Sequence, residues 1–241
     1  MSLPAPLQYL AWDSDFLGFP VARFTASGLA FSAISEAVAV ARQAGCRLLY
    51  VIIAPDDAAE ADALRQVGAG LVDRKVTYAV LLPSYVTTSI SPAIGDASGY
   101  SPQLESLAWQ SGEYSRFRLD LRFKPGVFQE LYSRWLCNSL SGEIARRVLV
   151  WRSPESQEAG LLTLGEKNDR ADIGLLAVDA TMRGQRVGQQ LVAAAHAQAI
   201  IWGYTTLQVV TQGDNVSACR FYEKCGFIPE NDIHIYHLWL D

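Results

Sequence analysis

The sequence predicts an α/β protein with a mixed sheet, in which a small N-terminal α/β domain precedes a larger C-terminal domain. Helical and strand patterns alternate over residues 20–82, which is typical of an α/β unit. Residues 84–102, "SYVTTSISPAIGDASGYSP", are rich in Ser, Thr, Gly and Pro, a composition that marks a joint. Farther along, successive strand patterns lead into a glycine-bearing turn and a long helix. We therefore expect domains at residues 1–85 and 86–241.

The N-terminal domain is expected to alternate extended and helical segments. Its first helical pattern ends at Gly45, because glycine commonly stops a helix. Pro55 and Asp56 open the second helix, since proline suits a helix start. The predicted strands are residues 20–26, 47–54 and 71–82, and the predicted helices are residues 31–45 and 56–69.

The C-terminal domain is expected to carry the remaining helices and most of the strands. A first short strand lies within residues 84–102, and a basic and aromatic segment, "EYSRFRLDLRFKPG", separates the first two helices. The predicted helices are residues 103–111, 127–140, a long helix through 192–203, and 215–226. The predicted strands are residues 146–152, 158–166, 172–178, 205–212 and 234–240.

Composition excludes several classes of function. No apolar run approaches the roughly 20 residues that cross a bilayer. The start, "MSLPAPLQYLAW", lacks a basic region before a long apolar stretch, so we expect a cytoplasmic protein with no membrane partner. A net charge of −5 argues against general nucleic-acid binding. His234 and His237 lie three apart on a strand, hence on opposite faces, and no metal is expected.

The turn "RGQRVGQQL", residues 183–191, joins a strand to a helix. The first amides of a helix lack acceptors, and the helix dipole adds positive charge there, so such a turn suits phosphate. Gly184 and Gly188 let the backbone approach a ligand, and Arg183 pairs with phosphate oxygens. The alternative is a tight junction without a ligand. Neither the GK[ST] of a P-loop nor the GxGxxG of a dinucleotide fold is present.

A second motif, "NVSACRFYEKCGF", spans residues 215–227. Asn215 suits a helix N-cap, and Tyr222 lies seven residues on, two turns later, on nearly the same face. The alternative is that Phe221 and Tyr222 are core aromatic residues.

Together these two motifs resemble the signature segments of the GNAT superfamily of acyl-CoA N-acyltransferases, over residues 172–227. The resemblance implies a mixed sheet in which the strands at 172–178 and 205–211 separate around the pantetheine arm of acetyl-CoA. At Arg186 the sequence departs from the family, which usually has a glycine there. We expect this to be tolerated if the φ angle of Arg186 is negative. The implied coenzyme contacts are Leu176, Ala177, Val178, Arg183, Gly184, Gln185, Arg186, Val187, Gly188, Gln189 and Asn215.

The resemblance also implies the chemistry of acyl transfer from a thioester to an amine through a tetrahedral intermediate. It places the general acid at Tyr222, whose phenol stays protonated at neutral pH. A backbone N–H near Leu176 would meet the oxygen of the intermediate. Asp172 is the candidate base, with Glu166 as an alternative, each acting through water.

The acceptor is predicted from the segment "SRFRLDLRF". On an extended chain Arg116 and Arg118 share one side, where they would bind a phosphate-bearing acceptor; the alternative is a solvated face. This segment, the stretch "LAWDSDFLGFPVARF" and the Asn215–Tyr222 spacing resemble the TDP-fucosamine acetyltransferases. That resemblance implies a dTDP-linked aminodeoxysugar as acceptor, and a homodimer. The alternatives are a peptide, ribosomal-protein or antibiotic amine as acceptor, or a non-catalytic domain that binds acyl-CoA.

Overall fold

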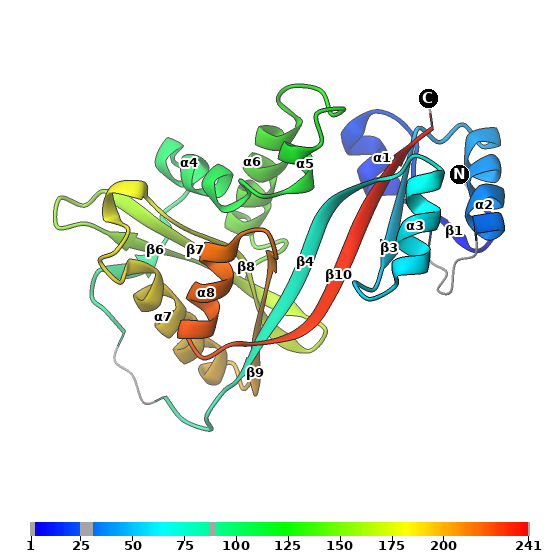
Figure 1. Cartoon of the computed structure of the whole chain (residues 1–241). Helices are drawn as coiled ribbons and strands as arrows, with labels where there is room; N and C mark the ends of the chain where they lie inside the picture. Colours follow the sequence, from blue (N-terminus) through cyan, green and yellow to red (C-terminus); the bar gives the residue numbers. More distant parts are fainter. Residues whose placement is uncertain (1–2, 25–30, 87–89, 241) are drawn as a thin grey trace. The chain divides into compact units, whose positions relative to one another are not determined.

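A computed structural model describes residues 3–24, 31–86 and 90–240, and Figure 1 traces the chain. Contacts divide the chain into two compact units. The first holds the chain up to Val76, Gln212–Asp214 and the segment from Asn231; the second holds Thr77–Thr211 and Asn215–Glu230. Residues 77–85 of the predicted N-terminal domain therefore lie in the second unit, and two segments of the predicted C-terminal domain lie in the first. The boundary near residue 85 stays a prediction about independent folding.

The first unit is a sheet with helices packed on it. Its strands follow the order β1-β2-β3-β10, with β4 next to β10. β2 and β3 are parallel, whereas β1 with β2 and β3 with β10 are antiparallel. The elements are β1 (Leu7–Tyr9), α1 (Ala11–Leu17), β2 (Val21–Phe24), α2 (Phe31–Gln43), β3 (Leu48–Ile53), α3 (Ala58–Gln66), and most of β4 (Gly70–Leu81) and β10 (Ile228–Trp239), both of which continue into the second unit.

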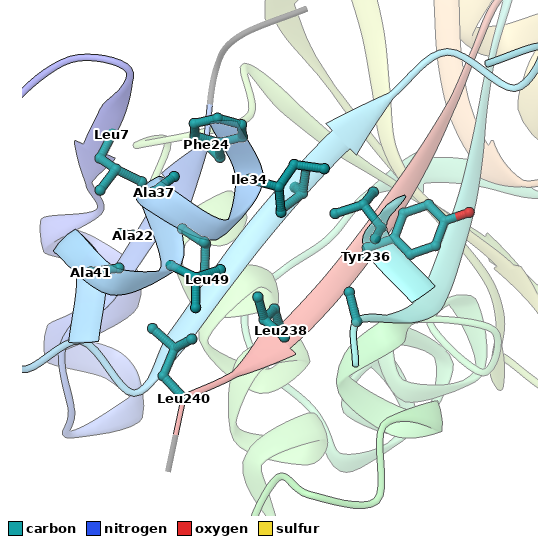
Figure 2. Packing of buried hydrophobic residues seen from close by; sticks show 14 of the residues in the cluster. Leu7, Ala22, Phe24, Ile34, Ala37, Ala41, Leu49, Tyr236, Leu238 and Leu240 are labelled. Carbon is teal, nitrogen blue, oxygen red and sulfur yellow. The ribbon is translucent and has the colours of Figure 1, made fainter. Parts of the chain in front are cut away.

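The core of this unit lies between α2 and the sheet, as Figure 2 shows. Ile34 and Ala41 of α2 pack with Leu49 of β3 and Leu238 of β10, and all four are nearly inaccessible to solvent. β10, the last strand, thereby contributes to the same hydrophobic core as the N-terminal elements α2 and β3. Burial of this apolar surface is the main source of stability for the unit.

The strands of the second unit follow the order β9-β8-β7-β6-β5, and β4, whose last residues belong to this unit, neighbours β9. β8 and β9 are parallel, and the other pairs from β5 to β8 are antiparallel. Its remaining elements are β5 (Ile94–Asp96), α4 (Pro102–Ser111), α5 (Arg116–Leu119), α6 (Val127–Leu140), β6 (Arg147–Arg152), β7 (Glu158–Lys167), β8 (Arg170–Val178), η1 (Ala180–Met182), α7 (Val187–Ile201), β9 (Thr206–Gln212) and α8 (Val216–Lys224).

Glycines show which helices cover this part of the sheet. A Cβ on Gly160 of β7 would lie 3.1 Å from Val187 Cγ1 of α7, whereas one on Gly174 of β8 would lie 3.5 Å from Trp135 Nε1 of α6. α7 and α6 therefore each pack directly against strands. The predicted mixed α/β class is confirmed.

The structure corrects three expectations about elements. The segment at 116–119 is not extended: it forms α5, because Ser115 caps it through the Phe117 N–H. The closing strand begins at Ile228 rather than at 234. β1 and α1 were not predicted, and part of the expected strand at 20–26 lies outside the described residues. No described helix has the length and apolar character needed to cross a membrane.

Candidate active site

β8 and β9 pair only at one end. Their parallel register runs from Ala171 opposite Leu207 to Ile173 opposite Val209. β8 continues to Val178 and β9 to Gln212, with no further register pair between them in the described part of the chain. The two strands therefore separate beyond Ile173, and one edge of β8 is available to a ligand.

The backbone of β8 alternates between this gap and β7. The N–H of Leu175 donates to Thr163 Oγ1 (2.8 Å) and that of Asp179 to the Ala159 carbonyl (2.8 Å), so odd-numbered residues face β7. Because backbone groups alternate along a strand, Leu176 and Val178 direct theirs into the gap. Ala177, which was grouped with them in the sequence prediction, lies between Leu175 and Asp179 in this alternation, so its backbone groups face β7.

The N-terminus of α7 lies at the end of this gap and has no side-chain cap. Its first intrahelical bond runs from the Gln190 N–H to the Arg186 carbonyl (3.0 Å). The amides of Val187, Gly188 and Gln189 precede that bond and are the ones a helix leaves without intrahelical acceptors. They provide donors for an anion.

Arg186 adopts a left-handed conformation, with φ 62° and ψ 15°. The expectation of a negative φ is therefore wrong. The turn needs the same backbone geometry that a glycine adopts without steric cost, and here an arginine adopts it at a cost of about 1 kcal/mol.

The two glycines of the turn have different roles. Gly184 has φ 80°, a conformation that favours glycine. Gly188 lies close to α8, because a Cβ there would be 3.1 Å from Phe221 Cε2 and Cζ. The absence of a side chain at Gly188 therefore leaves space for the Phe221 ring. The sequence analysis had explained the same glycine by close approach of the backbone to a ligand.

α8 begins with a capped N-terminus and carries Tyr222. Asn215 Oδ1 accepts a hydrogen bond from the Ala218 N–H (3.1 Å). The Tyr222 ring lies among Tyr78, Phe221 and Phe227, with centroids 6.1, 5.3 and 5.7 Å away. Burial raises the pKa of Tyr222 above its ordinary value. The phenol is therefore neutral at physiological pH, and it is a weaker acid than a solvent-exposed tyrosine.

These elements surround a pocket of about 590 Å³. Tyr222 and Asn215 from α8 lie in the same wall as the gap-facing end of β8 and the turn before α7. Gln185 does not line it; its amide donates to the Thr181 carbonyl (3.4 Å). The predicted coenzyme residues in the wall are Leu176, Ala177, Val178, Arg183, Gly184, Arg186, Val187, Gly188, Gln189 and Asn215.

Residues from the end of α4 also line this pocket, and the sequence interpretation missed them. They are Gln110, Ser111, Glu113 and Tyr114. Gln110 Oε1 accepts a bond from Arg183 Nη2 (3.2 Å), while Arg183 Nε donates to the Val178 carbonyl (3.1 Å). No motif in the sequence marks these residues, because their place in the pocket depends on the packing of α4 against the sheet.

The two candidate bases lie outside the pocket wall. Asp172 Oδ1 accepts from Gln208 Nε2 (2.9 Å), at the end where β8 and β9 are still paired. Desolvation raises the pKa of Asp172, opposed by the Gln208 hydrogen bond and by Lys167. Glu166 accepts a hydrogen bond from the Tyr204 hydroxyl. Either carboxylate would reach the pocket only through water.

Arg116 and Arg118 also lie outside the pocket wall. Because α5 is helical, they do not share one side of an extended chain as expected. Arg116 stacks over Phe117 at 4.7 Å and Arg118 over Phe128 at 5.3 Å. Both follow shortly after Tyr114, which is in the wall. Among the residues that the structure describes, no group of three His, Cys, Asp or Glu could hold a metal.

Two known proteins are similar to this chain in sequence. The chain is 29% identical over 227 residues to the dTDP-fucosamine acetyltransferase of Escherichia coli O6:H1, covering 94% of this chain and 95% of that protein. It is 29% identical over 133 residues to the spore coat polysaccharide biosynthesis protein SpsD of Bacillus subtilis, covering 55% of this chain and 45% of that protein.

A solved structure shares the fold. The GCN5-related N-acetyltransferase of Sphaerobacter thermophilus superposes with a TM-score of 0.63 at 12% identity, over 97% of this chain and 76% of that one. Residues 103–227, more than half of the chain, match the acetyltransferase (GNAT) family. The protein thus belongs to the GNAT family of acetyl-CoA-dependent enzymes, and it is an N-acetyltransferase.

Proposed function

We propose that this enzyme transfers the acetyl group of acetyl-CoA to the amine of a dTDP-linked aminodeoxysugar. The observation that carries the proposal is the pocket in which three features meet: the open edge of β8, the uncapped N-terminus of α7, and Tyr222. Similarity over almost the whole chain to a dTDP-fucosamine acetyltransferase supports the choice of acceptor.

The donor site is proposed from the backbone groups already described. The backbone of Leu176 and Val178 would pair with the pantetheine amides, which are themselves donors and acceptors. The α7 amides at Val187, Gly188 and Gln189 would bind the pyrophosphate, because they are free donors at the positive end of a helix dipole. Arg183 would contribute the guanidinium hydrogens that its bonds to Val178 and Gln110 leave over.

The chemistry needs a donor for the carbonyl oxygen and a proton for the departing sulfur. The Leu176 N–H faces the gap and would stabilise the oxygen as its negative charge develops. The Tyr222 hydroxyl would protonate the thiolate. The raised pKa of Tyr222 opposes early ionisation, so its proton would move only as charge develops on the sulfur.

A base would remove a proton from the acceptor amine. We retain Asp172 for this role, acting through water, because its raised pKa makes the carboxylate a stronger base. Glu166 is the alternative. The partnership with Gln208 fixes the orientation of Asp172 on the β8 face.

The acceptor would approach from the side of α4 and α5. Arg116 and Arg118 follow the wall residue Tyr114 and are proposed to bind the acceptor phosphates at the rim. A homodimer and a cytoplasmic location belong to the same proposal.

The test is a thiol-release assay with acetyl-CoA over a panel of amines. The panel would contain a dTDP-linked 4-amino-4,6-dideoxysugar, the same aminosugar without the nucleotide, a basic peptide and an aminated antibiotic. We expect turnover with the nucleotide-linked sugar at a kcat/KM at least about tenfold above that of the free aminosugar, a difference of about 1.4 kcal/mol. Preference for the peptide or the antibiotic would contradict the proposed acceptor.

A further inference from the structure

The pairing of β7 with β8 contains one irregularity among the residues that the structure describes. The register shifts between Leu162 and Leu164 of β7. Within this shift Thr163 alone spans the interval that two residues of β8, Gly174 and Leu175, occupy. An extra residue on one strand of an antiparallel pair is a β-bulge, which bends the strand and re-aims its groups.

Before the bulge, even-numbered residues of β8 direct their backbone groups toward β7. The two strands are joined by Asn168 and Asp169, whose left-handed φ angles, 54° and 59°, are typical of a two-residue hairpin turn. The flanking residues Lys167 and Arg170 pair with each other. In a hairpin of this kind the flanking pair exchanges both of its backbone hydrogen bonds, and the direction then alternates along the strand. Arg170 and Asp172 therefore face β7.

Beyond the bulge this direction is reversed. The N–H groups of Leu175 and Asp179 donate to residues of β7, so Leu176 faces the gap. In a regular strand with the same turn, Leu176 would share the direction of Asp172, and its N–H would point toward β7. The extra residue therefore turns the Leu176 N–H toward the gap. The parallel pairing of β8 with β9 ends at Ile173, immediately before the bulge.

Thr163 holds the bulge through its side chain. Its Oγ1 accepts the Leu175 N–H at 2.8 Å, and the residue is 1% exposed. The residues next to it in β7, Leu162 and Leu164, are fully buried and apolar, so a hydroxyl here is unfavourable unless it is hydrogen-bonded. Gly174 lacks the Cβ that would lie 2.9 Å from this oxygen, which leaves room for the bond. The bond to Leu175 therefore accounts for a threonine in an otherwise apolar stretch.

We infer that Thr163 is a positioning residue for acetyl transfer: its hydroxyl fixes the bulge, and the bulge directs the Leu176 N–H at the carbonyl oxygen of the acetyl group. The inference rests on the proposed function, in which this N–H stabilises the negative charge of the tetrahedral intermediate. Thr163 itself lies outside the pocket wall and would touch no reacting atom. A donor of this kind acts only if it is already aimed when charge develops, and removal of one costs about 10²–10³ in kcat.

Two substitutions of Thr163 separate its hydroxyl from its volume. Thr163→Val keeps the shape and removes the acceptor of the Leu175 N–H, whereas Thr163→Ser keeps the hydroxyl and removes a methyl group. We expect kcat to fall about tenfold in Thr163→Val, which is part of the loss that removal of the donor would cause, while the KM for acetyl-CoA changes less than about threefold. Thr163→Ser should keep kcat within about threefold of the original.

A loss of stability alone would give a different result. Ser139→Ala is the matched control, because Ser139 is 3% exposed, lies outside the pocket wall, and donates from its Oγ to the Trp135 carbonyl at 2.9 Å. Both Ser139→Ala and Thr163→Val should lower the midpoint of thermal unfolding, but only Thr163→Val should lower kcat. If Thr163→Val does not fold, Gly174→Ala tests the same bulge from β8, because its Cβ would displace the Thr163 hydroxyl and should lower kcat in the same way.

Infrared spectroscopy of bound acetyl-CoA measures the proposed contact directly, because a hydrogen bond to the thioester carbonyl lowers its stretching frequency. With acetyl-CoA that is isotope-labelled at the carbonyl carbon, we expect a higher frequency in Thr163→Val than in the original protein, and the original frequency in Thr163→Ser. An unchanged band in folded Thr163→Val, or a kcat equal to that of the original protein, would overturn the inference. Failure of the original protein to bind acetyl-CoA would instead overturn the proposed function.

Discussion

The two helices that flank the pocket begin in opposite ways. α8 is capped by its own Asn215, whose side chain satisfies the Ala218 N–H. α7 follows a left-handed Arg186 and has no side-chain cap. Asparagine at an N-cap stabilises a helix by about 1 kcal/mol, and α7 does without this contribution.

The different N-termini of α7 and α8 are consistent with different roles: α8 positions Tyr222, and α7 offers backbone donors to the pocket. The capped helix is complete in itself and holds the ring of Tyr222 among aromatic neighbours. The first amides of α7 have no side-chain cap, and in the proposed donor site a phosphate of acetyl-CoA would take its place.

The largest effect is expected for Tyr222→Phe on the capped helix. The change keeps the ring and removes the hydroxyl, so kcat should fall by a factor on the order of 10²–10⁴ while acetyl-CoA affinity stays nearly the same. Steady-state turnover and calorimetry measure the two quantities. Tyr78→Phe is the matched control, because Tyr78 is a buried neighbour that donates to Glu223 Oε1 (3.1 Å). If Tyr222→Phe retains its kcat, Tyr222 is a packing residue only.

Gly188→Glu tests the uncapped helix. A carboxylate there would repel the pyrophosphate, and the acetyl-CoA dissociation constant should rise on the order of 10²-fold. Because a Cβ would press on Phe221, part of any loss comes from packing. Gly188→Ala measures that part alone. Equal acetyl-CoA affinities for Gly188→Glu and Gly188→Ala would contradict binding of the pyrophosphate at the N-terminus of α7.

Asn215→Ala removes the cap of α8. We expect the free energy of unfolding to fall by about 1 kcal/mol, measured by urea denaturation. Asn215→Asp keeps an acceptor for the Ala218 N–H and should retain the stability of the original protein. An unchanged unfolding free energy in Asn215→Ala would show that the Asn215 cap does not stabilise α8. The comparison with the uncapped α7 would then carry no energetic difference.

The smallest effect on stability is expected for Asp172→Asn, at the paired end of β8. The folded-state pKa of Asp172 is raised, so the folded state binds more protons than the unfolded state between the unfolded pKa of about 3.9 and the folded value. Stability from this group therefore falls as pH rises through that window. The amide introduced by Asp172→Asn cannot ionise, so the unfolding free energy should depend less on pH above about pH 4 and should be higher at neutral pH.

The same variant tests the proposed base. If Asp172 accepts the amine proton, Asp172→Asn should lower kcat and remove the acidic limb of the pH–rate profile. A kcat unchanged across that profile would leave Glu166 or water in that role.

Most helices and strands, the family, and several of the segments that line the pocket were predicted from the sequence alone. Those features are local: periodicity predicts β8 and α7, and Asn215 predicts a helix cap. Each depends on the residues next to it along the chain, which is what a local pattern records.

Features that depend on contacts between distant residues became visible only in the tertiary structure. The return of β10 to β3, the place of Gln110 and Tyr114 in the pocket, and the fit of Gly188 against Phe221 join segments far apart in sequence. It also decided the sign of φ at Arg186, because the backbone geometry of the turn overrides the preference of the side chain. The helical α5 in place of an extended segment has a related cause: Ser115 caps a turn that also brings Phe117 and Phe123 into contact, with ring centroids 5.2 Å apart.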